Sequence, residues 1–240
     1  MAEDSAKLGA RTSMGAQTRP VGARAALVAE VAACVPAAVG SDCVRVGVDG
    51  VDGAGKTIFA AELASTLRDL GRPVVEFSVD GWHRVRAERY ARGPRSPEGF
   101  WLDSFDYPRL VDEALTPLGP GGSRWFRTAG HDVHTDEVLW PELVEAPEGS
   151  VVVIDGLFLH RAELEGCFEF TVFVDVPFEV TAARMAVRDG SPADPAHPDL
   201  RRYVEAQQTY FAERAPWSRA DLVVDNTDLA NPVLVTGRLD

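Results

Sequence analysis

The chain has 240 residues, and its 24 Lys and Arg against 37 Asp and Glu give a formal net charge of −13. A charge of this sign disfavours nucleic acid polymers and anionic membrane surfaces as partners, because both are themselves negatively charged. The longest segment without a charged residue, 31–41, is far shorter than the ~20 apolar residues that cross a bilayer, so we expect no transmembrane helix.

Residues 1–18 are small and polar without hydrophobic periodicity, which predicts a disordered leader before a single domain over 19–240. The leader begins Met-Ala-Glu-Asp, whereas a secretory signal begins with positive charge and continues into an apolar stretch. The three widely spaced cysteines fit reduced thiols better than disulfides or a zinc site. We therefore expect a cytoplasmic protein.

The first regular elements are a helix over 20–34, where apolar residues recur at helical spacing, and a strand over 44–49, which is a short β-branched run. A glycine-rich segment follows this strand directly, and the helix after it ends at Gly71. The chain thus runs from strand to glycine loop to helix, which is the context that a phosphate-binding loop requires.

The glycine-rich segment 50–57 reads GVDGAGKT and fits the pattern GxxxxGK[ST]. Glycines allow backbone conformations in which successive N–H groups turn toward phosphate oxygens, and the helix N-terminus adds partial positive charge. The lysine can then bridge the β- and γ-phosphates, and the threonine can ligate Mg²⁺. We predict that the loop binds ATP through Gly50, Asp52, Gly53, Ala54, Gly55, Lys56 and Thr57.

The remaining elements predict a parallel sheet with helices on both faces. Two apolar runs without alternation, 151–155 and 170–175, are typical of strands that are buried on both faces. Between two later helices, the proline-rich segment 189–198 is a candidate lid. The other expected elements are strands over 73–79 and 220–225 and helices over 106–115, 177–188 and 199–214.

Two kinds of side chain gather in the region 82–135, which we expect to cap the substrate. Eight aromatic residues fall within 82–126, where a ring could stack on a pyrimidine, although we expect at least half of them to lie in the core. Five arginines between 84 and 95 either face solvent or bind phosphate groups of ATP or of a phosphorylated acceptor.

Two classes of P-loop protein find no support in the sequence. A GTPase would carry an NKxD sequence for base recognition, but the nearest fragment, 226–229, reads NTDL and has its acidic residue one place early. A transporter ATPase would carry an LSGGQ-like signature, which the chain lacks. A small-molecule kinase is then the favoured class.

Seven segments resemble the uridine kinase and phosphoribulokinase-like group of P-loop kinases, and they follow the order of that family from residue 47 to 228. The loop alone also resembles that of thymidylate kinases, but the segment after the second strand lacks their arginine-proline-glycine pattern. The seven segments are GVDGVDGAGKT (47–57), SVDGWHR (78–84), SPEGFWLDSFDYP (96–108), TAGHDVHTD (128–136), VVVIDGLFLH (151–160), FVDVPFEVTAARMAVRD (173–189) and ADLVVDNTD (220–228).

Asp80 follows the second strand, so we expect its carboxylate at the same edge of the sheet as the phosphate loop. There it can orient an acceptor hydroxyl and accept its proton, and it matches the catalytic aspartate of the resembled group. Asp155 ends an apolar strand, a position from which an acidic residue reaches Mg²⁺ together with Thr57. The resemblance also implies a lid arginine, Arg188, which joins Asp80 and Lys56 as a catalytic residue.

The resemblance implies further residues that bind the acceptor. Asp106 would hold the ribose hydroxyls, and His131 or His134 would approach the base. The substrate residues expected from these matches are Asp80, Trp82, His83, Arg84, Asp106 and His131.

We therefore predict an α/β kinase with the P-loop NTPase fold, a parallel sheet of about five strands and helices on both faces. The expected reaction uses ATP and Mg²⁺ to phosphorylate a hydroxyl of a nucleoside, with uridine or cytidine first. Met185 stands where the group can carry an arginine near the pyrimidine, and the lid lacks an ERGR-like run. Because of these departures, a sugar phosphate or other small metabolite stays open as the acceptor, as in phosphoribulokinase or pantothenate kinase. A P-loop ATPase or switch without a small-molecule acceptor is a further alternative. The oligomeric state is also open, and a homo-oligomer is possible.

Overall fold

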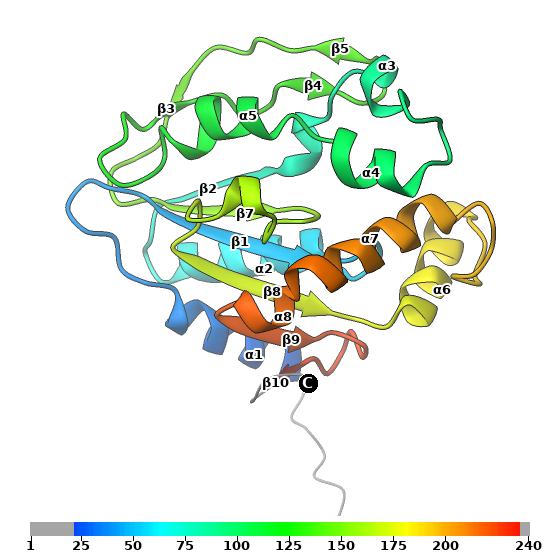
Figure 1. Cartoon of the computed structure of the whole chain (residues 1–240). Helices are drawn as coiled ribbons and strands as arrows, with labels where there is room; N and C mark the ends of the chain where they lie inside the picture. Colours follow the sequence, from blue (N-terminus) through cyan, green and yellow to red (C-terminus); the bar gives the residue numbers. More distant parts are fainter. Residues whose placement is uncertain (1–21, 236–240) are drawn as a thin grey trace, which may run out of the picture.

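The computed structural model describes residues 22–235, so the leader predicted over 1–18 lies outside the described residues. Its central feature is a six-stranded sheet (Figure 1). Five strands are parallel, as expected, and the edge strand β10 runs antiparallel to β9. From one edge to the other the strands are β10 (Val233–Val235), β9 (Leu222–Asp225), β8 (Phe170–Asp175), β1 (Val44–Gly50), β7 (Val151–Asp155) and β2 (Val74–Ser78).

The middle of the sheet is buried on both faces, which explains why β7 and β8 read as apolar runs without alternation. β1 lies between β7 and β8, and Val46 pairs with Val153 on one side and with Phe170 on the other. All residues of β1 and β7 are buried. Because parallel strands all point the same way, the segments that leave their carboxyl ends meet at one edge of the sheet.

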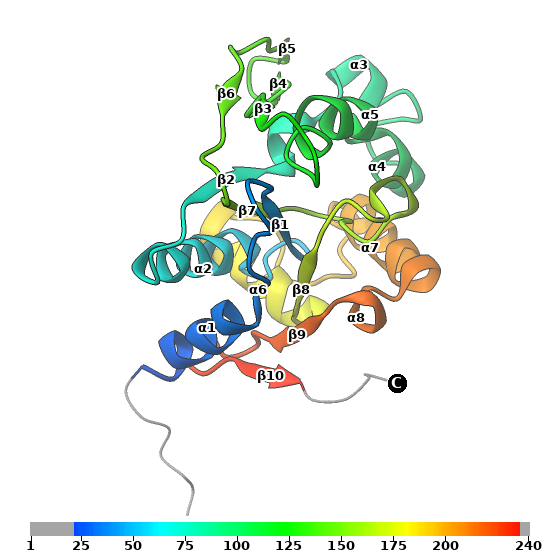
Figure 2. The ribbon, with the colours of Figure 1, turned by 90° about the vertical axis from the view of Figure 1, so that its left-hand side faces the viewer.

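Helices cover both faces of the sheet (Figure 2). On one face, α1 (Ala23–Cys34) and α2 (Lys56–Asp69) pack through residues such as Leu27 and Leu63. On the other face lie α4 (Pro97–Asp103), α5 (Tyr107–Leu110) and α7 (Arg201–Arg214). The remaining helices of the described residues are α3 (Arg86–Arg89), α6 (Phe178–Asp189) and α8 (Pro216–Arg219).

Most expected elements agree with the structure to within a few residues at their ends. The helix expected over 106–115 is α5 followed by a π-helical turn, Val111–Leu115. The segment between α6 and α7 contains neither helix nor strand, and its role as a lid stays a prediction. The sequence analysis missed β10, because a three-residue, partly exposed edge strand is too short for a periodic pattern.

The chain segment that connects β2 to β7 forms a capping layer, which lies above the sheet in Figure 1. It contains a 3₁₀ turn, Val79–Trp82, followed by α3, α4 and α5. It reaches beyond the expected boundary at residue 135, because two small antiparallel pairs complete it. These pairs are β3 (Trp125–Phe126) with β6 (Val144–Glu145) and β4 (His131–Asp132) with β5 (Glu137–Val138).

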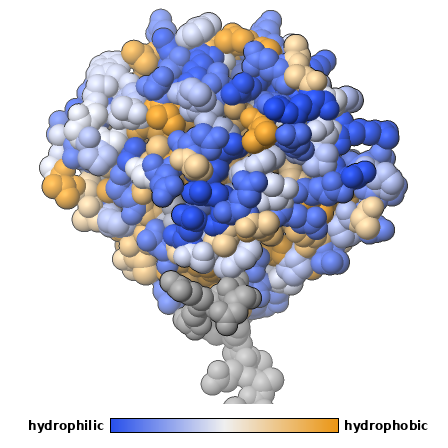
Figure 3. All heavy atoms as spheres, in the orientation of Figure 1, coloured by the Kyte–Doolittle hydropathy of each residue, from blue (hydrophilic) through white to orange (hydrophobic). Residues whose placement is uncertain are grey.

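Within residues 22–235, none of the helices combines the length and the apolar character that crossing a membrane demands. On the face seen in Figure 3, apolar side chains lie in separate small groups among polar ones.

Candidate active site

The loop between β1 and α2 has the backbone shape that the glycine pattern predicts. Gly53 and Gly55 have φ angles of 74° and 91°, in the left-handed region that favours glycine. A Cβ atom on Gly55 would also lie 2.9 Å from Nδ2 of Asn226. The loop therefore needs glycine at this position both for its conformation and for close packing, and it delivers the chain into the N-terminus of α2.

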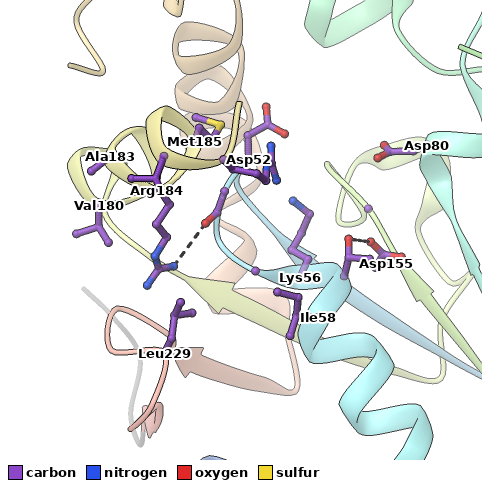
Figure 4. Close-up of a pocket in the computed structure, with 16 residues that line it drawn as sticks. Asp52, Lys56, Ile58, Asp80, Asp155, Val180, Ala183, Arg184, Met185 and Leu229 are labelled. Atoms are coloured by element: carbon purple, nitrogen blue, oxygen red, sulfur yellow. Dashed lines mark hydrogen bonds between the residues drawn. The ribbon is translucent and has the colours of Figure 1, made fainter. Parts of the chain in front are cut away.

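A cavity of about 700 Å³ lies in front of this loop (Figure 4), within the size range of ligand pockets. Its two ends differ in chemistry. Charged and polar side chains, including Lys56, Thr57, Asp80 and Asp155, line one end. The apolar lining residues are Ile58, Val180, Ala183, Met185, Val187 and Leu229. A ligand with a charged tail and an apolar ring system matches this division.

Lys56 points into the cavity between Asp52 and the carboxylates of Asp80 and Asp155 (Figure 4). Its Nζ donates to the carbonyl oxygen of Val51 at 2.9 Å, so the ammonium group lies against its own loop. It is the one lysine among the residues that the structure describes. The ammonium group can exchange this carbonyl for phosphate oxygens without a change in the backbone.

The two expected magnesium ligands lie together. Oγ1 of Thr57 donates to Oδ2 of Asp155 at 2.6 Å, and the hydroxyl of Ser78 donates to the carbonyl oxygen of Asp155 at 3.2 Å. Burial and, more weakly, the charge of Asp80 raise the pKa of Asp155, while Thr57 and Lys56 act against this shift. The residues that the structure describes hold no group of three or more His, Cys, Asp or Glu able to bind a metal ion. One hydroxyl and one carboxylate nevertheless fit Mg²⁺, which takes its other ligands from water and substrate phosphates.

Asp80 lies in the 3₁₀ turn that follows β2, and its carboxylate is exposed in the cavity wall opposite α6 (Figure 4). The turn is held by two hydrogen bonds, because the Asp80 N–H donates to Ser78 Oγ at 3.3 Å and the Asp80 carbonyl pairs with His83 Nδ1 at 2.8 Å. The backbone is thus fixed while the carboxylate stays free to meet a substrate.

A second, smaller cavity of about 90 Å³ lies in the capping layer, and residues that follow Asp80 in the chain line part of it. It brings together the other expected acceptor residues, which are Trp82, His83, Arg84, Asp106 and His131. Asp106 also caps α5, since its Oδ1 accepts the N–H of Arg109 at 3.2 Å. Burial lowers the pKa of His83, which favours the neutral imidazole. The sequence analysis therefore selected residues that the fold does place around one cavity.

Gly50 and Ala54 do not line the larger cavity but shape the loop from beneath. Ala54 is fully buried, and its carbonyl oxygen accepts the Nδ2 group of Asn226 at 2.7 Å. The N–H of Gly50 donates to Oδ1 of Asp49 at 2.7 Å. The N–H of Asp52 is likewise engaged, by Oε1 of Gln207 at 2.8 Å. Of the expected loop contacts, Asp52, Gly53, Gly55, Lys56 and Thr57 line the cavity, but the N–H of Asp52 is not available to phosphate because Gln207 accepts it.

The aromatic cluster is largely core, as expected. Six of its eight members are buried, and only Tyr90 and Trp125 are exposed. Burial of a large ring stabilises the fold more than exposure for stacking would, which explains the outcome.

The reading of the arginine cluster as a site for the phosphates of ATP is wrong, because none of the five lines the larger cavity. Most of these guanidinium groups instead form ion pairs with carboxylates from other parts of the chain. Arg89 pairs with Asp136 at 3.4 Å, and Arg95 pairs with Asp199 at 3.8 Å. Arg84 alone reaches the smaller cavity.

Two arginines of α6 do line the larger cavity. The side chain of Arg188 is 67% exposed and pairs with Asp189 at 2.6 Å. Arg184 donates to the carbonyl oxygens of Asn226 at 2.8 Å and Thr227 at 2.9 Å, which ties α6 to the segment after β9. Burial lowers the pKa of Arg184.

The sequence analysis missed a buried network beneath the loop. Asp49 is fully buried, and it accepts hydrogen bonds from the hydroxyl of Tyr210 and from Nδ1 of His160, the latter at 2.8 Å. The one clue in the sequence was an acidic residue in a strand that is expected to be buried.

No protein-family model matches the chain. Among curated proteins, it is 26% identical to a dephospho-CoA kinase of Thermobifida fusca over 189 residues, which cover 76% of this chain and 87% of that protein. It is 25% identical to a uridine kinase of Shewanella halifaxensis over 153 residues, which cover 62% of this chain and 69% of that protein. The solved structure of a "Possible Uridine Kinase" from Bacillus stearothermophilus matches with a TM-score of 0.65 and 23% identity, over 83% of this chain and 96% of that one.

The solved structure supports the fold, and the curated relatives support the class of enzyme. Both agree with the order of motifs along the chain and with the cavity in front of the phosphate loop. The chain is a phosphotransferase, similar in sequence to curated uridine kinases and in fold to a solved P-loop kinase structure.

Proposed function

We propose that the protein transfers the γ-phosphoryl group of ATP to a hydroxyl group of a nucleoside, with uridine and cytidine as the first candidates. One observation carries this proposal: Lys56, Thr57, Asp155 and Asp80 line the same end of one cavity, at the carboxyl edge of the parallel sheet. Groups that bind phosphate, a group that binds metal and a free carboxylate are what in-line phosphoryl transfer needs.

In this proposal the ATP phosphates lie against the loop and Lys56, and the adenine ring occupies the apolar end near Val180 and Leu229. Thr57 and Asp155 would hold Mg²⁺, which neutralises charge on the phosphoryl oxygens when it is bound. Asp80 orients the acceptor hydroxyl and takes its proton as the oxygen bonds to the γ-phosphorus and ADP leaves. Arg188 supplies positive charge when the segment after α6 closes.

The nucleoside assignment rests on the residues that line the small cavity and on the curated uridine kinases that match the chain. Asp106 offers carboxylate oxygens for the ribose hydroxyls, and His131 lies in the same cavity wall. A cytoplasmic location belongs to the same proposal, since all three cysteines are free thiols.

An acceptor smaller than a nucleoside is a second candidate, which the acceptor cavity itself favours. Its volume of about 90 Å³ equals that of about three water molecules. Its aromatic faces are also already in contact with the protein, because the Arg109 guanidinium lies 5.9 Å from the Trp82 ring and His83 stacks on Phe105 at 4.4 Å. A small sugar or hydroxy acid would need no such face.

Purified protein with ATP, Mg²⁺ and a panel of acceptors tests these proposals through ADP release. The panel comprises uridine, cytidine, small sugars, sugar phosphates and pantothenate. Release that depends on a nucleoside supports the first candidate, release that depends on a small sugar supports the second, and release without any acceptor indicates an ATPase. Asp80→Asn should abolish transfer while ATP binding persists, and unchanged turnover would remove Asp80 from the mechanism.

A further inference from the structure

The helix α7 contacts the phosphate loop through Gln207, a residue that is only 2% exposed. Oε1 of Gln207 accepts the N–H of Asp52 at 2.8 Å, and its Nε2 donates to Oδ2 of Asp52 at 3.3 Å. Nε2 also donates to the carbonyl oxygen of Tyr203 at 3.0 Å, which fixes the amide in this orientation. The backbone and the side chain of one loop residue are therefore both held by one buried side chain.

One turn further along the same face of α7, Tyr210 contacts the residue on which the loop begins. Its hydroxyl donates to Oδ2 of Asp49, while Oδ1 of Asp49 accepts the N–H of Gly50 at 2.7 Å. Burial and the neighbouring charge of Asp49 raise the pKa of Tyr210, so its hydroxyl keeps its proton and stays a donor. Nδ1 of His160 is the third partner of this carboxylate, at 2.8 Å.

A fully buried carboxylate is costly unless hydrogen bonds surround it, so Asp49 stays in place only while these partners do. Its position directly before Gly50 makes it a rigid base for the first half of the loop. Asn226 holds the second half through the carbonyl oxygen of Ala54. The loop is thus fixed from outside, and α7 provides two of its anchors.

The other end of α7 is attached to the capping layer. Arg202 is 6% exposed and donates to the carbonyl oxygens of Pro94 at 3.0 Å and Arg89 at 3.3 Å. Its guanidinium also lies 4.7 Å from the centre of the Tyr90 ring. The helix therefore bridges the layer that holds the acceptor cavity and the loop that faces the larger one.

We propose that Gln207 and Tyr210 are positioning residues that hold the phosphate loop, through Asp52 and Asp49, in the shape that receives the triphosphate of ATP. This inference rests on the proposed function in one respect, namely that ATP is the ligand of the loop. Neither residue lines the polar end of the larger cavity, so each acts through the loop backbone.

The test compares ATP·Mg²⁺ affinity by calorimetry in four variants of the full chain. Gln207→Ala is matched by Gln208→Ala, its exposed neighbour, and Tyr210→Phe is matched by Tyr203→Phe on the same helix. We expect the Kd for ATP to rise about fivefold to 30-fold in the Gln207 and Tyr210 variants, as for a lost hydrogen bond of about 1 to 2 kcal/mol, and to stay within twofold in the matched variants. In steady-state assays the KM for ATP should rise while the KM for the acceptor stays unchanged, because only the phosphate loop is disturbed.

Thermal unfolding separates this role from general destabilisation. A positioning role predicts weaker ATP binding at temperatures where each variant is fully folded. If Tyr210→Phe does not fold, Gln207→Ala alone still decides. If the wild type binds ATP·Mg²⁺ and Gln207→Ala binds it with the same affinity, this inference is overturned. If calorimetry detects no binding of ATP·Mg²⁺ to the wild type, the proposed function is overturned as well.

Discussion

Thr57 Oγ1 donates to Asp155 Oδ2 at 2.6 Å, across 98 residues of sequence. The bond joins the first turn of α2 to the carboxyl end of β7, and both groups are oxygen ligands that suit Mg²⁺. The same carboxylate is largely buried, and this burial raises its pKa. The residue is therefore placed for metal binding at the expense of the stability of the ligand-free protein.

Asp155→Asn should abolish Mg²⁺-dependent phosphoryl transfer and also raise the melting temperature of the ligand-free protein at neutral pH. Because the folded state raises the pKa of Asp155, it holds this proton more tightly than the unfolded state does. Stability then falls as pH rises from the ordinary aspartate pKa, about 3.9, through the raised value. The increase in melting temperature of Asp155→Asn should thus be present at pH 7 and disappear below about pH 4. Each kcal/mol of added stability corresponds to an increase of about 2 to 4 °C in melting temperature.

Asp175→Asn is the matched control for this prediction. Burial and the charge of Asp225 raise the pKa of Asp175, but this residue does not line the larger cavity. Its variant should gain stability with the same pH dependence and keep its activity. A neutral or negative change in melting temperature for Asp155→Asn at pH 7 would contradict the electrostatic argument.

Lys56→Met should weaken ATP·Mg²⁺ binding at least tenfold, because an ammonium group that can meet phosphate oxygens is lost. Its one hydrogen bond among the residues described is to the Val51 carbonyl, but its charge also opposes the raised pKa of Asp52 and of Asp155, so thermal stability at neutral pH should fall. The sequence contains only one other lysine, Lys7, so labelling with an amine-reactive probe is easy to assign by peptide mass. ATP should protect Lys56 from the probe and leave the labelling of Lys7 unchanged. Equal labelling of Lys56 with and without ATP would remove it from the nucleotide site.

Asp106 combines two roles that two variants can separate. Asp106→Asn keeps an oxygen that can accept the Arg109 N–H, so the cap of α5 and the melting temperature should be preserved. The loss of charge should still raise the KM of the acceptor about tenfold, as for a hydrogen bond to a charged group. Asp106→Ala should show the same change in KM and lose about 1 kcal/mol of stability as well. An unchanged KM in Asp106→Asn would assign Asp106 to the cap alone.

The parts of this fold that were predicted are those that local sequence determines. The glycine loop follows from residues adjacent in the chain, and the parallel strands follow from continuous apolar runs. The proximity of Thr57 and Asp155 was also predictable, because parallel strands direct their carboxyl ends to one edge. Each of these inferences needs only a local pattern and a general rule of topology.

The parts that were missed depend on partners that no local pattern identifies. Asp49 and Tyr210 are 161 residues apart in the sequence, and no motif around either residue predicts that the two are in contact. For the arginines between 84 and 95 the sequence left both solvent exposure and phosphate binding open, because a cluster of charge does not reveal which distant carboxylates will neutralise it. Asp136 and Asp199 do so in the fold.

Arg188→Ala should lower kcat about 100-fold and leave the affinity for ATP within a few fold, because its charge is needed most when the phosphoryl group is in transit. In the structure, Asp189 accepts hydrogen bonds from the Arg188 guanidinium, from Nε at 2.7 Å and from Nη2 at 2.6 Å. Asp189→Asn should therefore retain kcat or raise it, since it releases the arginine toward the cavity.

Arg201→Ala is the matched control. The Arg201 side chain is also 67% exposed and pairs with Glu205 at 2.7 Å, but it does not line the cavity. The kcat of this variant should therefore be unchanged. Equal rates for Arg188→Ala and Arg201→Ala in a stopped-flow measurement of a single turnover would show that Arg188 forms only a surface ion pair.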